Sequence, residues 1–208
     1  MQYEIKKSKV KNAPLMILIH GFGANRFDLL GLSEFFPDVN ILSLEAPYQM
    51  NAQQSYWYEI QWVGNDKIVN VEQAKYSKLM LVNFIENEIE KIDDEFKKEN
   101  IFLMGFSQGA ILSYSVASEL TYIKRIYGLS GYIDDRITDI TNLDNKELEI
   151  FACHGISDEV IPVSQARQAN KILKEYDLKR YEYIEHKEGH WISQDVLTKL
   201  INWHNNND

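Results

Sequence analysis

The sequence predicts an α/β fold with a mostly parallel β-sheet and helices on both faces. Short apolar runs of strand length alternate with amphipathic helical patterns along most of the 208 residues. Several of these runs lack polar alternation, which is typical of strands covered on both faces. No repeat, low-complexity stretch or interdomain linker interrupts the alternation, and the length suits one substantial core. We therefore expect a single domain over residues 1–208.

The predicted strands are apolar runs bounded by residues that favour turns. Residues 15–19 form a continuous run that stops at a His-Gly-Phe-Gly turn, and residues 39–44 form a second run that Pro47 closes. Further strands are predicted at 101–104, 125–129 and 148–152. Residues 180–184 alternate between polar and apolar side chains, which indicates an edge strand.

Helical patterns fill the intervals between the strands. Asn25 can cap a helix whose apolar positions continue to Phe36, just before Pro37. Residues 71–98 have one apolar and one charged side, which predicts a long amphipathic helix. The other predicted helices are 108–120, 163–176 and 192–204. No period holds between residues 48 and 70, so this aromatic-rich segment is predicted to be the longest irregular loop.

The composition argues against several classes of partner. The chain has 31 acidic residues against 22 Lys and Arg, and the basic residues are scattered, so we expect no nucleic acid partner. Cys153 is the only cysteine, which rules out an internal disulfide and favours a reducing, cytoplasmic location. The N-terminus lacks the apolar segment of a signal peptide, and the apolar runs are too short to span a bilayer. We therefore expect no integral membrane segment.

A Gly-Phe-Ser-Gln-Gly motif occupies residues 105–109, between a predicted strand and a predicted helix. In that context G-x-S-x-G places its serine at the apex of a sharp turn at the top of a sheet. The turn imposes strained backbone angles on Ser107, and the two glycines let strand and helix pass closely. A glycine-rich turn with an incidental serine is the alternative, but the flanking patterns favour an exposed, reactive hydroxyl.

A serine hydroxyl needs an imidazole to take its proton and a carboxylate to orient that imidazole. Asp158 and His190 follow the predicted strands 148–152 and 180–184. Because the carboxyl ends of parallel strands meet at one edge of a sheet, these side chains are expected to meet Ser107 there. We predict a triad of Ser107 as nucleophile, Asp158 as acid and His190 as base, in the chain order typical of such folds. Asp134 and Asp135 are rival acids, but they follow an earlier strand.

Acyl transfer develops negative charge on a carbonyl oxygen, and backbone N–H groups can stabilise it. The N–H of Gln108 begins the helix after the serine, where the helix dipole helps. The N–H of Phe22, in the glycine-flanked turn after the strand 15–19, can face the same point. We predict Phe22 and Gln108 as the oxyanion hole. His20 is expected to support this turn through hydrogen bonds rather than to act as a base.

These motifs resemble those of the phospholipase/carboxylesterase family of α/β-hydrolases, which includes bacterial carboxylesterases and acyl-protein thioesterases. Residues 20–23 look like the family's oxyanion turn, and residues 105–109 match its serine turn, including the glutamine. Residues 154–162 resemble its acid loop and residues 189–190 its histidine turn. The resemblance runs nearly end to end and implies an α/β-hydrolase fold. It also implies the same roles for the five predicted site residues. Residues 134–147 are short and polar, which predicts a minimal lid.

The sequence therefore predicts a serine carboxylesterase that hydrolyses short- to medium-chain carboxylic esters through an acyl-enzyme on Ser107. An acyl-protein thioesterase or lysophospholipase with the same triad is the alternative, and a noncatalytic binding module of the same fold is a third interpretation. Tyr48, Trp57 and Trp62 are predicted to wall the substrate groove, with core packing as their alternative role.

The expected partner is a small-molecule ester or thioester, an acylated protein or a lysolipid, and a homodimer is one candidate assembly. No metal or organic cofactor is expected for this reaction. The reason is that no cluster of histidines and carboxylates has metal-ligand spacing and no glycine-rich loop suits a dinucleotide.

Overall fold

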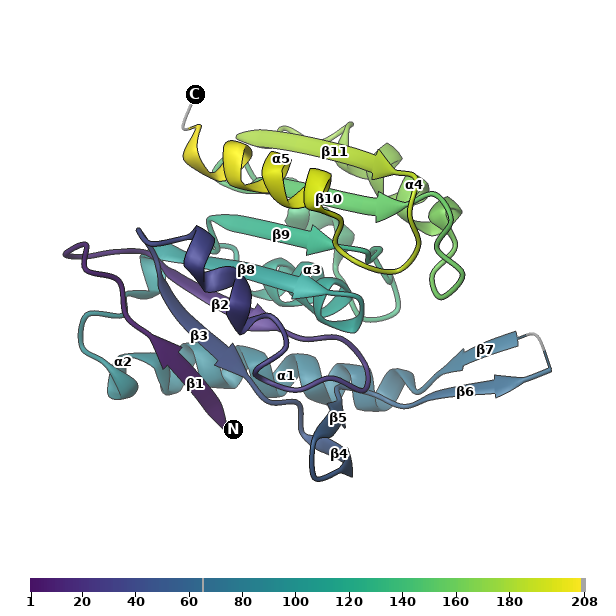
Figure 1. Cartoon of the computed structure of the whole chain (residues 1–208), viewed down its shortest axis with the longest axis horizontal. Coiled ribbons are helices and arrows are strands. Elements are labelled where there is room, and N and C mark those ends of the chain that lie inside the picture. Colours follow the sequence, from purple (N-terminus) through teal and green to yellow (C-terminus); the bar gives the residue numbers. More distant parts are fainter. Residues whose placement is uncertain (65, 207–208) are drawn as a thin grey trace.

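A seven-stranded, mostly parallel sheet runs through the computed structural model of the protein, which describes residues 1–64 and 66–206 (Figure 1). The strand order is β1-β3-β2-β8-β9-β10-β11. Strand β1 pairs antiparallel with β3, and the other neighbouring pairs in this sheet are parallel. The bounds are β1 (Tyr3–Lys6), β2 (Leu15–Ile19), β3 (Asn40–Leu44), β8 (Ile101–Phe106), β9 (Arg125–Leu129), β10 (Glu149–Gly155) and β11 (Arg180–His186).

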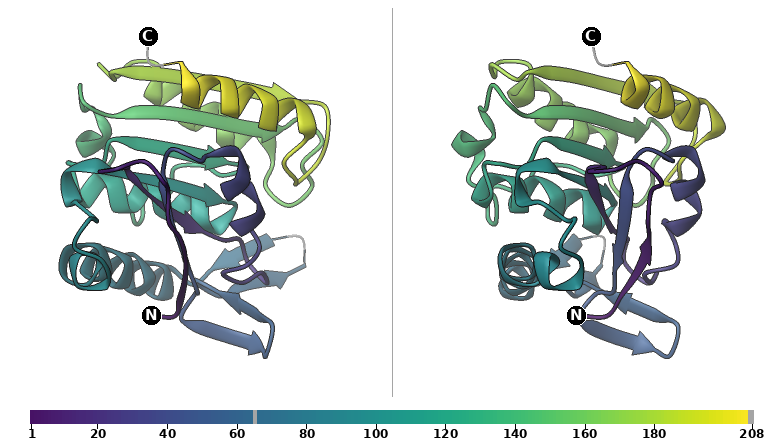
Figure 2. Two further views of the ribbon diagram at one scale, coloured as in Figure 1. Left: turned by 60° about the vertical axis from the view of Figure 1, so that its left-hand side comes forward. Right: turned by 90° about the vertical axis from the view of Figure 1, so that its left-hand side faces the viewer.

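Helices cover both faces of this sheet (Figure 2). Helices α1 (Val71–Asn87), α3 (Gln108–Glu119) and α4 (Val163–Leu173) pack on one face, together with the short α2 (Ile89–Ile92). Helix α5 (Gln194–Asn205) and the 3₁₀ helix η1 (Leu30–Phe35) pack on the other face. The predicted α/β class is thus confirmed, with a sheet buried between two layers of helices.

The alternation of side chains along β2 divides the core into two clusters. Leu15, Ile17 and Ile19 pack with residues of α1 and α3, whereas Met16 and Leu18 pack with residues of α5. Successive residues of a strand point to opposite faces, so an uninterrupted apolar run is what a sheet with two covered faces requires. The position of β2 between β3 and β8 agrees with its predicted place inside the sheet.

Most predicted elements are present with small differences at their ends. Strands β2 and β9 match the predicted runs, and β8 and β10 continue further, to Phe106 and Gly155. Strand β11 lies at the edge of the sheet, as its alternating pattern indicates. Strand β1 was not predicted: it has four largely exposed residues, and its pairing with β3 depends on residues far away in the sequence.

The prediction of one irregular loop over residues 48–70 is wrong. This segment forms two antiparallel hairpins, β4 (Tyr48–Asn51) with β5 (Gln54–Tyr56), and β6 (Ile60–Val63) with β7 (Asp66–Val69). The strands are short and much of β4 is exposed, so they carry little of the hydrophobic periodicity on which sequence prediction depends.

Two predicted helices are shorter than expected. The segment that begins at Asn25 contains only η1: the Asn25 side chain accepts a hydrogen bond from Phe27 N (2.9 Å), and a turn over residues 26–29 leads into η1. The predicted helix 71–98 ends at Asn87, and α2 and the 3₁₀ helix η2 (Lys98–Asn100) follow.

Residues 134–147 hold only a third 3₁₀ helix, η3 (Ile140–Leu143), in agreement with a minimal lid. Within the described residues, no helix has the length and hydrophobicity to cross a bilayer.

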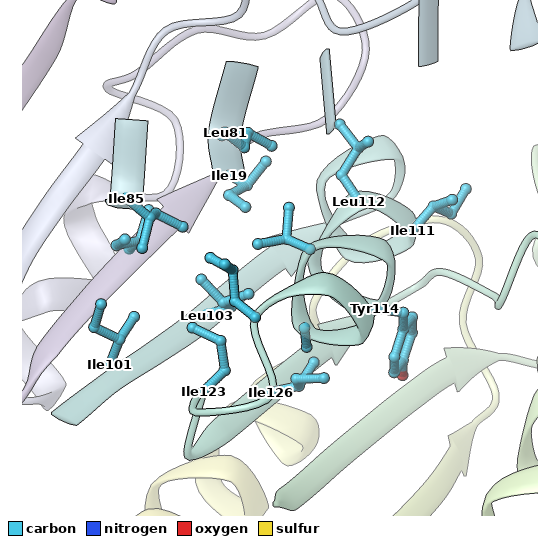
Figure 3. Packing of buried hydrophobic residues seen from close by; sticks show 14 of the residues in the cluster. Ile19, Leu81, Ile85, Ile101, Leu103, Ile111, Leu112, Tyr114, Ile123 and Ile126 are labelled. Atoms are coloured by element: carbon cyan, nitrogen blue, oxygen red, sulfur yellow. The ribbon is translucent and has the colours of Figure 1, made fainter. Parts of the chain in front are cut away.

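Leu103 allows a direct test of the core. Figure 3 shows its side chain in the cluster that contains Leu81 and Ile85 of α1, and Leu103 is fully buried. Leu103→Ala should lower the free energy of unfolding by about 2–5 kcal/mol, because it removes buried apolar surface and leaves a cavity. Leu79→Ala is the matched control, since Leu79 lies on α1 with 55% of its surface exposed. Urea titration should give a change within about 0.5 kcal/mol for the control, and equal losses for the two variants would contradict the core assignment.

Candidate active site

Ser107 lies at the turn between β8 and α3, with backbone angles of φ 55° and ψ −115°. This conformation is strained for a residue with a side chain, as the motif predicts. The Ser107 N–H donates a hydrogen bond to the Leu129 carbonyl (2.9 Å) at the end of β9, which anchors the turn to the sheet. A hydrogen bond to the neighbouring strand β9 therefore helps to hold the strained turn in place.

Gly105 and Gly109 allow the close approach of strand and helix that this turn needs. A Cβ atom on Gly109 would lie 1.8 Å from the Ile19 carbonyl oxygen, and one on Gly105 would lie 2.2 Å from the Gly109 carbonyl oxygen. Real Cβ atoms do not come so close to backbone atoms, and backbone cannot move aside as a flexible side chain can. The two glycines of the motif are thus required by packing around Ser107.

The structure brings the three residues of the predicted triad together at the carboxyl ends of the strands. Asp158 follows β10 and His190 follows β11. His190 Nε2 lies 2.9 Å from Ser107 Oγ, and His190 Nδ1 lies 2.6 Å from Asp158 Oδ2. A proton on Nδ1, donated to the carboxylate, leaves Nε2 free to accept the hydroxyl proton of Ser107. The arrangement can therefore transfer a proton from the serine to the imidazole.

The carboxylate of Asp158 is fully buried and is held by hydrogen bonds. Its Oδ1 accepts from the backbone N–H groups of Val160 (2.9 Å) and Ile161 (2.8 Å). Its Oδ2 lies 3.3 Å from His154 Nε2, which also lies 2.8 Å from the Ile161 carbonyl oxygen. Hydrogen-bond donors on both oxygens fix the orientation of this carboxylate toward His190.

His154 is a contact of this carboxylate that the sequence reasoning missed. The side chain is completely buried at the end of β10, and burial lowers its pKa below the ordinary histidine value. A neutral His154 with its proton on Nε2 donates to both the Ile161 carbonyl and the Asp158 carboxylate. The spacing of four residues between His154 and Asp158, with a glycine after the histidine, is the signal in the sequence that could have indicated the contact.

The side chain of Gln108 is a second contribution that the sequence reasoning missed. Its Oε1 accepts from Trp57 N (3.1 Å), and its Nε2 donates to the Tyr58 carbonyl (2.7 Å). The residue is buried, so these two bonds tie the segment after β5 to the start of α3 directly beside Ser107. The predicted contribution of Gln108 is its backbone N–H, and the side chain has this additional structural role.

The turn after β2 is held by a buried polar cluster around His20. His20 Nδ1 lies 2.7 Å from the Gly21 carbonyl oxygen, and Nε2 accepts from Ala46 N (3.2 Å). Ser55 Oγ lies 3.2 Å from Nε2 and donates to the Glu45 carboxylate. Burial lowers the pKa of His20, which keeps the ring neutral. These contacts give His20 the supporting role expected from the sequence.

A pocket of about 490 Å³ opens onto Ser107 and His190. This volume lies within the range of about 300–1,000 Å³ that is usual for small-molecule sites. The walls combine apolar side chains with the predicted site residues and two charged groups: Gly21, Phe22, Ala24, Asp28, Tyr58, Ile60, Lys67, Phe106, Ser107, Gln108, Ile111, Val160, Ile161 and His190. Within residues 1–64 and 66–206, no three His, Cys, Asp or Glu side chains gather in a metal-binding arrangement.

The predicted groove residues do not form this wall as expected. The prediction is wrong for Trp57, which is completely buried in the core and donates from Nε1 to the His20 carbonyl (2.9 Å). Tyr48 is not among the residues that line the pocket; it stacks on Tyr56 with ring centroids 5.5 Å apart. The backbone of Trp62 lies in β6, but its side chain lies outside the part of the chain that the structure describes. Phe22, Tyr58 and Phe106 are the aromatic residues of the wall instead.

Known proteins share this sequence pattern and architecture. The model of the Phospholipase/Carboxylesterase family matches residues 1–206. The acyl-protein thioesterase 1 of Kluyveromyces lactis is 29% identical over 93% of both chains, and that of Yarrowia lipolytica is 27% identical over 94% of this chain and 92% of its own. The crystal structure of the Bacillus cereus carboxylesterase superposes with a TM-score of 0.78 at 20% identity, over 98% of this chain and 93% of that one.

The fold is that of the α/β-hydrolases. The match of the family model over nearly the whole length then shows more than the fold: the chain belongs to the phospholipase/carboxylesterase family. It is accordingly a hydrolase, and the interpretation as a noncatalytic binding module is not supported.

The Gln108 side chain gives a test of how the site is held together. Gln108→Met keeps a similar size but leaves the Trp57 N–H and the Tyr58 carbonyl without their partner. A buried polar group left unsatisfied costs about 1–3 kcal/mol, so urea unfolding should show a loss of at least this size. Gln165→Met, at an exposed position of α4, is the control and should change stability by less than about 0.5 kcal/mol. Two variants of equal stability would show that the Gln108 side chain does not hold the segment.

Proposed function

We propose that this protein is a serine carboxylesterase that hydrolyses short- to medium-chain carboxylic esters through an acyl-enzyme on Ser107. The observation that carries the proposal is the continuous hydrogen-bonded line from Ser107 Oγ through His190 to Asp158, at the wall of a largely apolar pocket. The apolar side chains suit an acyl group, and the polar atoms converge where its carbonyl carbon must lie.

In the first half of the reaction, Ser107 Oγ attacks the carbonyl carbon of the ester while its proton passes to His190 Nε2. Asp158 stabilises the imidazolium that forms, and its buried, fully hydrogen-bonded carboxylate remains an acceptor throughout. The tetrahedral intermediate collapses when His190 returns the proton to the leaving alkoxide. The products of this half are the free alcohol and an ester of the acyl group with Ser107.

The negative charge on the carbonyl oxygen is assigned to the backbone N–H groups of Phe22 and Gln108. Both residues line the pocket beside Ser107. Gln108 is the first residue of α3, where the helix dipole favours an anion. The polar cluster around His20 and the side-chain bonds of Gln108 hold the two segments that carry these groups, so the donors need little rearrangement in the transition state.

In the second half, water replaces the serine hydroxyl as the nucleophile. His190 Nε2 takes a proton from the water while the water oxygen attacks the acyl-enzyme carbonyl. His190 then returns this proton to Ser107 Oγ as the carboxylic acid leaves. The same five residues therefore serve both halves, and this sequence of steps uses no group other than the chain's own side chains, its backbone and water.

An acyl-protein thioesterase or a lysophospholipase is the second candidate. The relatives from Kluyveromyces lactis and Yarrowia lipolytica bear the name acyl-protein thioesterase 1, and this observation favours the thioesterase. The chemistry differs only in the leaving group, a thiolate in place of an alkoxide. The short segment 134–147, which holds only η3 and forms no extended lid, supports the shorter acyl chains of the first candidate. A homodimer and a cytoplasmic location stay predictions; the burial of Cys153, which raises its pKa to about 12, agrees with an unoxidised thiol.

Ser107→Ala should lower kcat for p-nitrophenyl butyrate about a thousandfold or more, because it removes the nucleophile and leaves binding largely intact. A fluorophosphonate probe should label the wild type and fail to label this variant. Ser164→Ala, at an exposed position of α4, is the control and should retain both activity and labelling. Undiminished turnover by Ser107→Ala would end the assignment of the nucleophile.

A chain-length series separates the two candidate functions. We expect kcat/KM for p-nitrophenyl esters to be highest between acetate and octanoate and to fall for palmitate, because residues 134–147 hold only η3 and provide no lid that would extend the apolar surface for a long chain. Hydrolysis of a palmitoylated peptide thioester would be measured in parallel. A kcat/KM for this thioester above that for the octanoyl ester would favour the acyl-protein thioesterase.

A further inference from the structure

A lysine lies in the wall of the pocket that contains Ser107 and His190. Lys67 belongs to β7, in the hairpin that β6 and β7 form. Figure 1 shows this hairpin projecting beyond the main sheet on the side toward which the arrows of β8 to β11 point. The hairpin therefore brings a cation to the carboxyl-end edge of the sheet, where the reacting groups lie.

Lys67 is a half-buried cation without an ion-pair partner among the side chains that the structure describes. By contrast, Lys78 of α1 forms an ion pair with Glu119, with Nζ 2.7 Å from the carboxylate. Burial lowers the pKa of Lys67, and the charge of Asp158 opposes this effect. Asp158 is already bound to His190 and to backbone N–H groups, so its carboxylate does not satisfy the ammonium donors. An ammonium group removed in part from water gains from an anion placed beside it.

We propose that Lys67 selects substrates that carry an anionic group, a carboxylate or a phosphate, on the part of the molecule that lies against β7. This inference rests on the proposed esterase function and names the substrate class of the same site. The apolar side chains of Tyr58, Ile60 and Val160 line the remainder of the pocket and take the apolar part of the substrate. The ester carbonyl lies at Ser107 and the charged end at Lys67.

The charge distribution of the protein makes this assignment specific to Lys67. The net charge is −9, so the molecule as a whole repels an anionic substrate. Asp28 is the other charged residue that lines the pocket, and it is exposed, so solvent screens its charge more strongly. Lys67 is thus the positively charged residue of the pocket wall, and it can offset the repulsion between the acidic protein and a bound anion.

The test compares matched esters that differ by one negative charge. For a charge on the acyl side, mono-p-nitrophenyl adipate is compared with p-nitrophenyl hexanoate. For a charge on the leaving group, phenyl acetate with a para carboxylate is compared with its methyl ester. The readout is the ratio of kcat/KM for the anionic ester to that for the neutral ester, determined in each enzyme variant. The ratio cancels changes that affect both esters equally, such as a partial loss of folded protein.

In at least one of the two pairs, Lys67→Met should lower this ratio about tenfold, and Lys67→Glu should lower it further. Lys67→Arg should preserve most of it, because the charge is retained. Added sodium chloride should lower the ratio in the wild type and have little effect on it in Lys67→Met. The pair that responds shows whether the acyl side or the leaving group carries the charge.

Lys146→Met is the control for net charge. Lys146 precedes β10, at the opposite end of the sheet from the pocket, and its side chain is 81% exposed. For Lys146→Met, the ratio of kcat/KM for the anionic ester to that for the neutral ester should equal the wild-type ratio. Ratios for Lys67→Met within twofold of the wild type in both pairs would overturn the inference. That result leaves the esterase assignment intact if Ser107→Ala remains inactive on the neutral esters, whereas full activity of Ser107→Ala would contradict the esterase proposal itself.

Discussion

The close passage of α3 over β2 and β8 is the constraint on which the site depends. A methyl group at position 109 would collide with the backbone of Ile19, and one at position 105 would collide with the start of α3. This packing holds Ser107 at φ 55°, a conformation that the residue would not adopt alone. The strain is therefore maintained by the burial of an apolar sheet between two helical layers, and it places the largely buried Ser107 at the wall of the pocket.

A second constraint is the full satisfaction of the buried carboxylate. Asp158 lies at the end of β10 and receives hydrogen bonds from two backbone N–H groups, His190 and His154. Its loop thus acts as a rigid support for an imidazole that comes from the next strand of the sheet. The parallel pairing of β10 with β11, in register from Glu149 to Gly155, sets the distance between these two loops. The distance between Asp158 and His190 therefore depends on the register of β10 and β11.

The two hairpins of residues 48–70 are the part of the molecule that differs most from its prediction. The second hairpin contributes Ile60 and Lys67 to the pocket. The segment between the hairpins contributes Tyr58 and is held by the side chain of Gln108. Trp57, expected at the surface of a groove, is instead an anchor in the core, bonded to the turn of His20. The composition of the pocket wall thus follows from contacts between segments about 50 residues apart.

The sequence by itself determined most of the sheet and the three residues of the proposed triad, because uninterrupted apolar runs and a glycine-bounded serine are local signals tied to one geometry. Ser107, Asp158 and His190 could be named since parallel strands end at a common edge. Only the tertiary structure decided that β1 joins the sheet, that residues 48–70 form hairpins and that His154 and Lys67 lie beside the site. Short or exposed strands and single polar side chains have no periodic pattern, and their positions depend on neighbours that are distant along the chain.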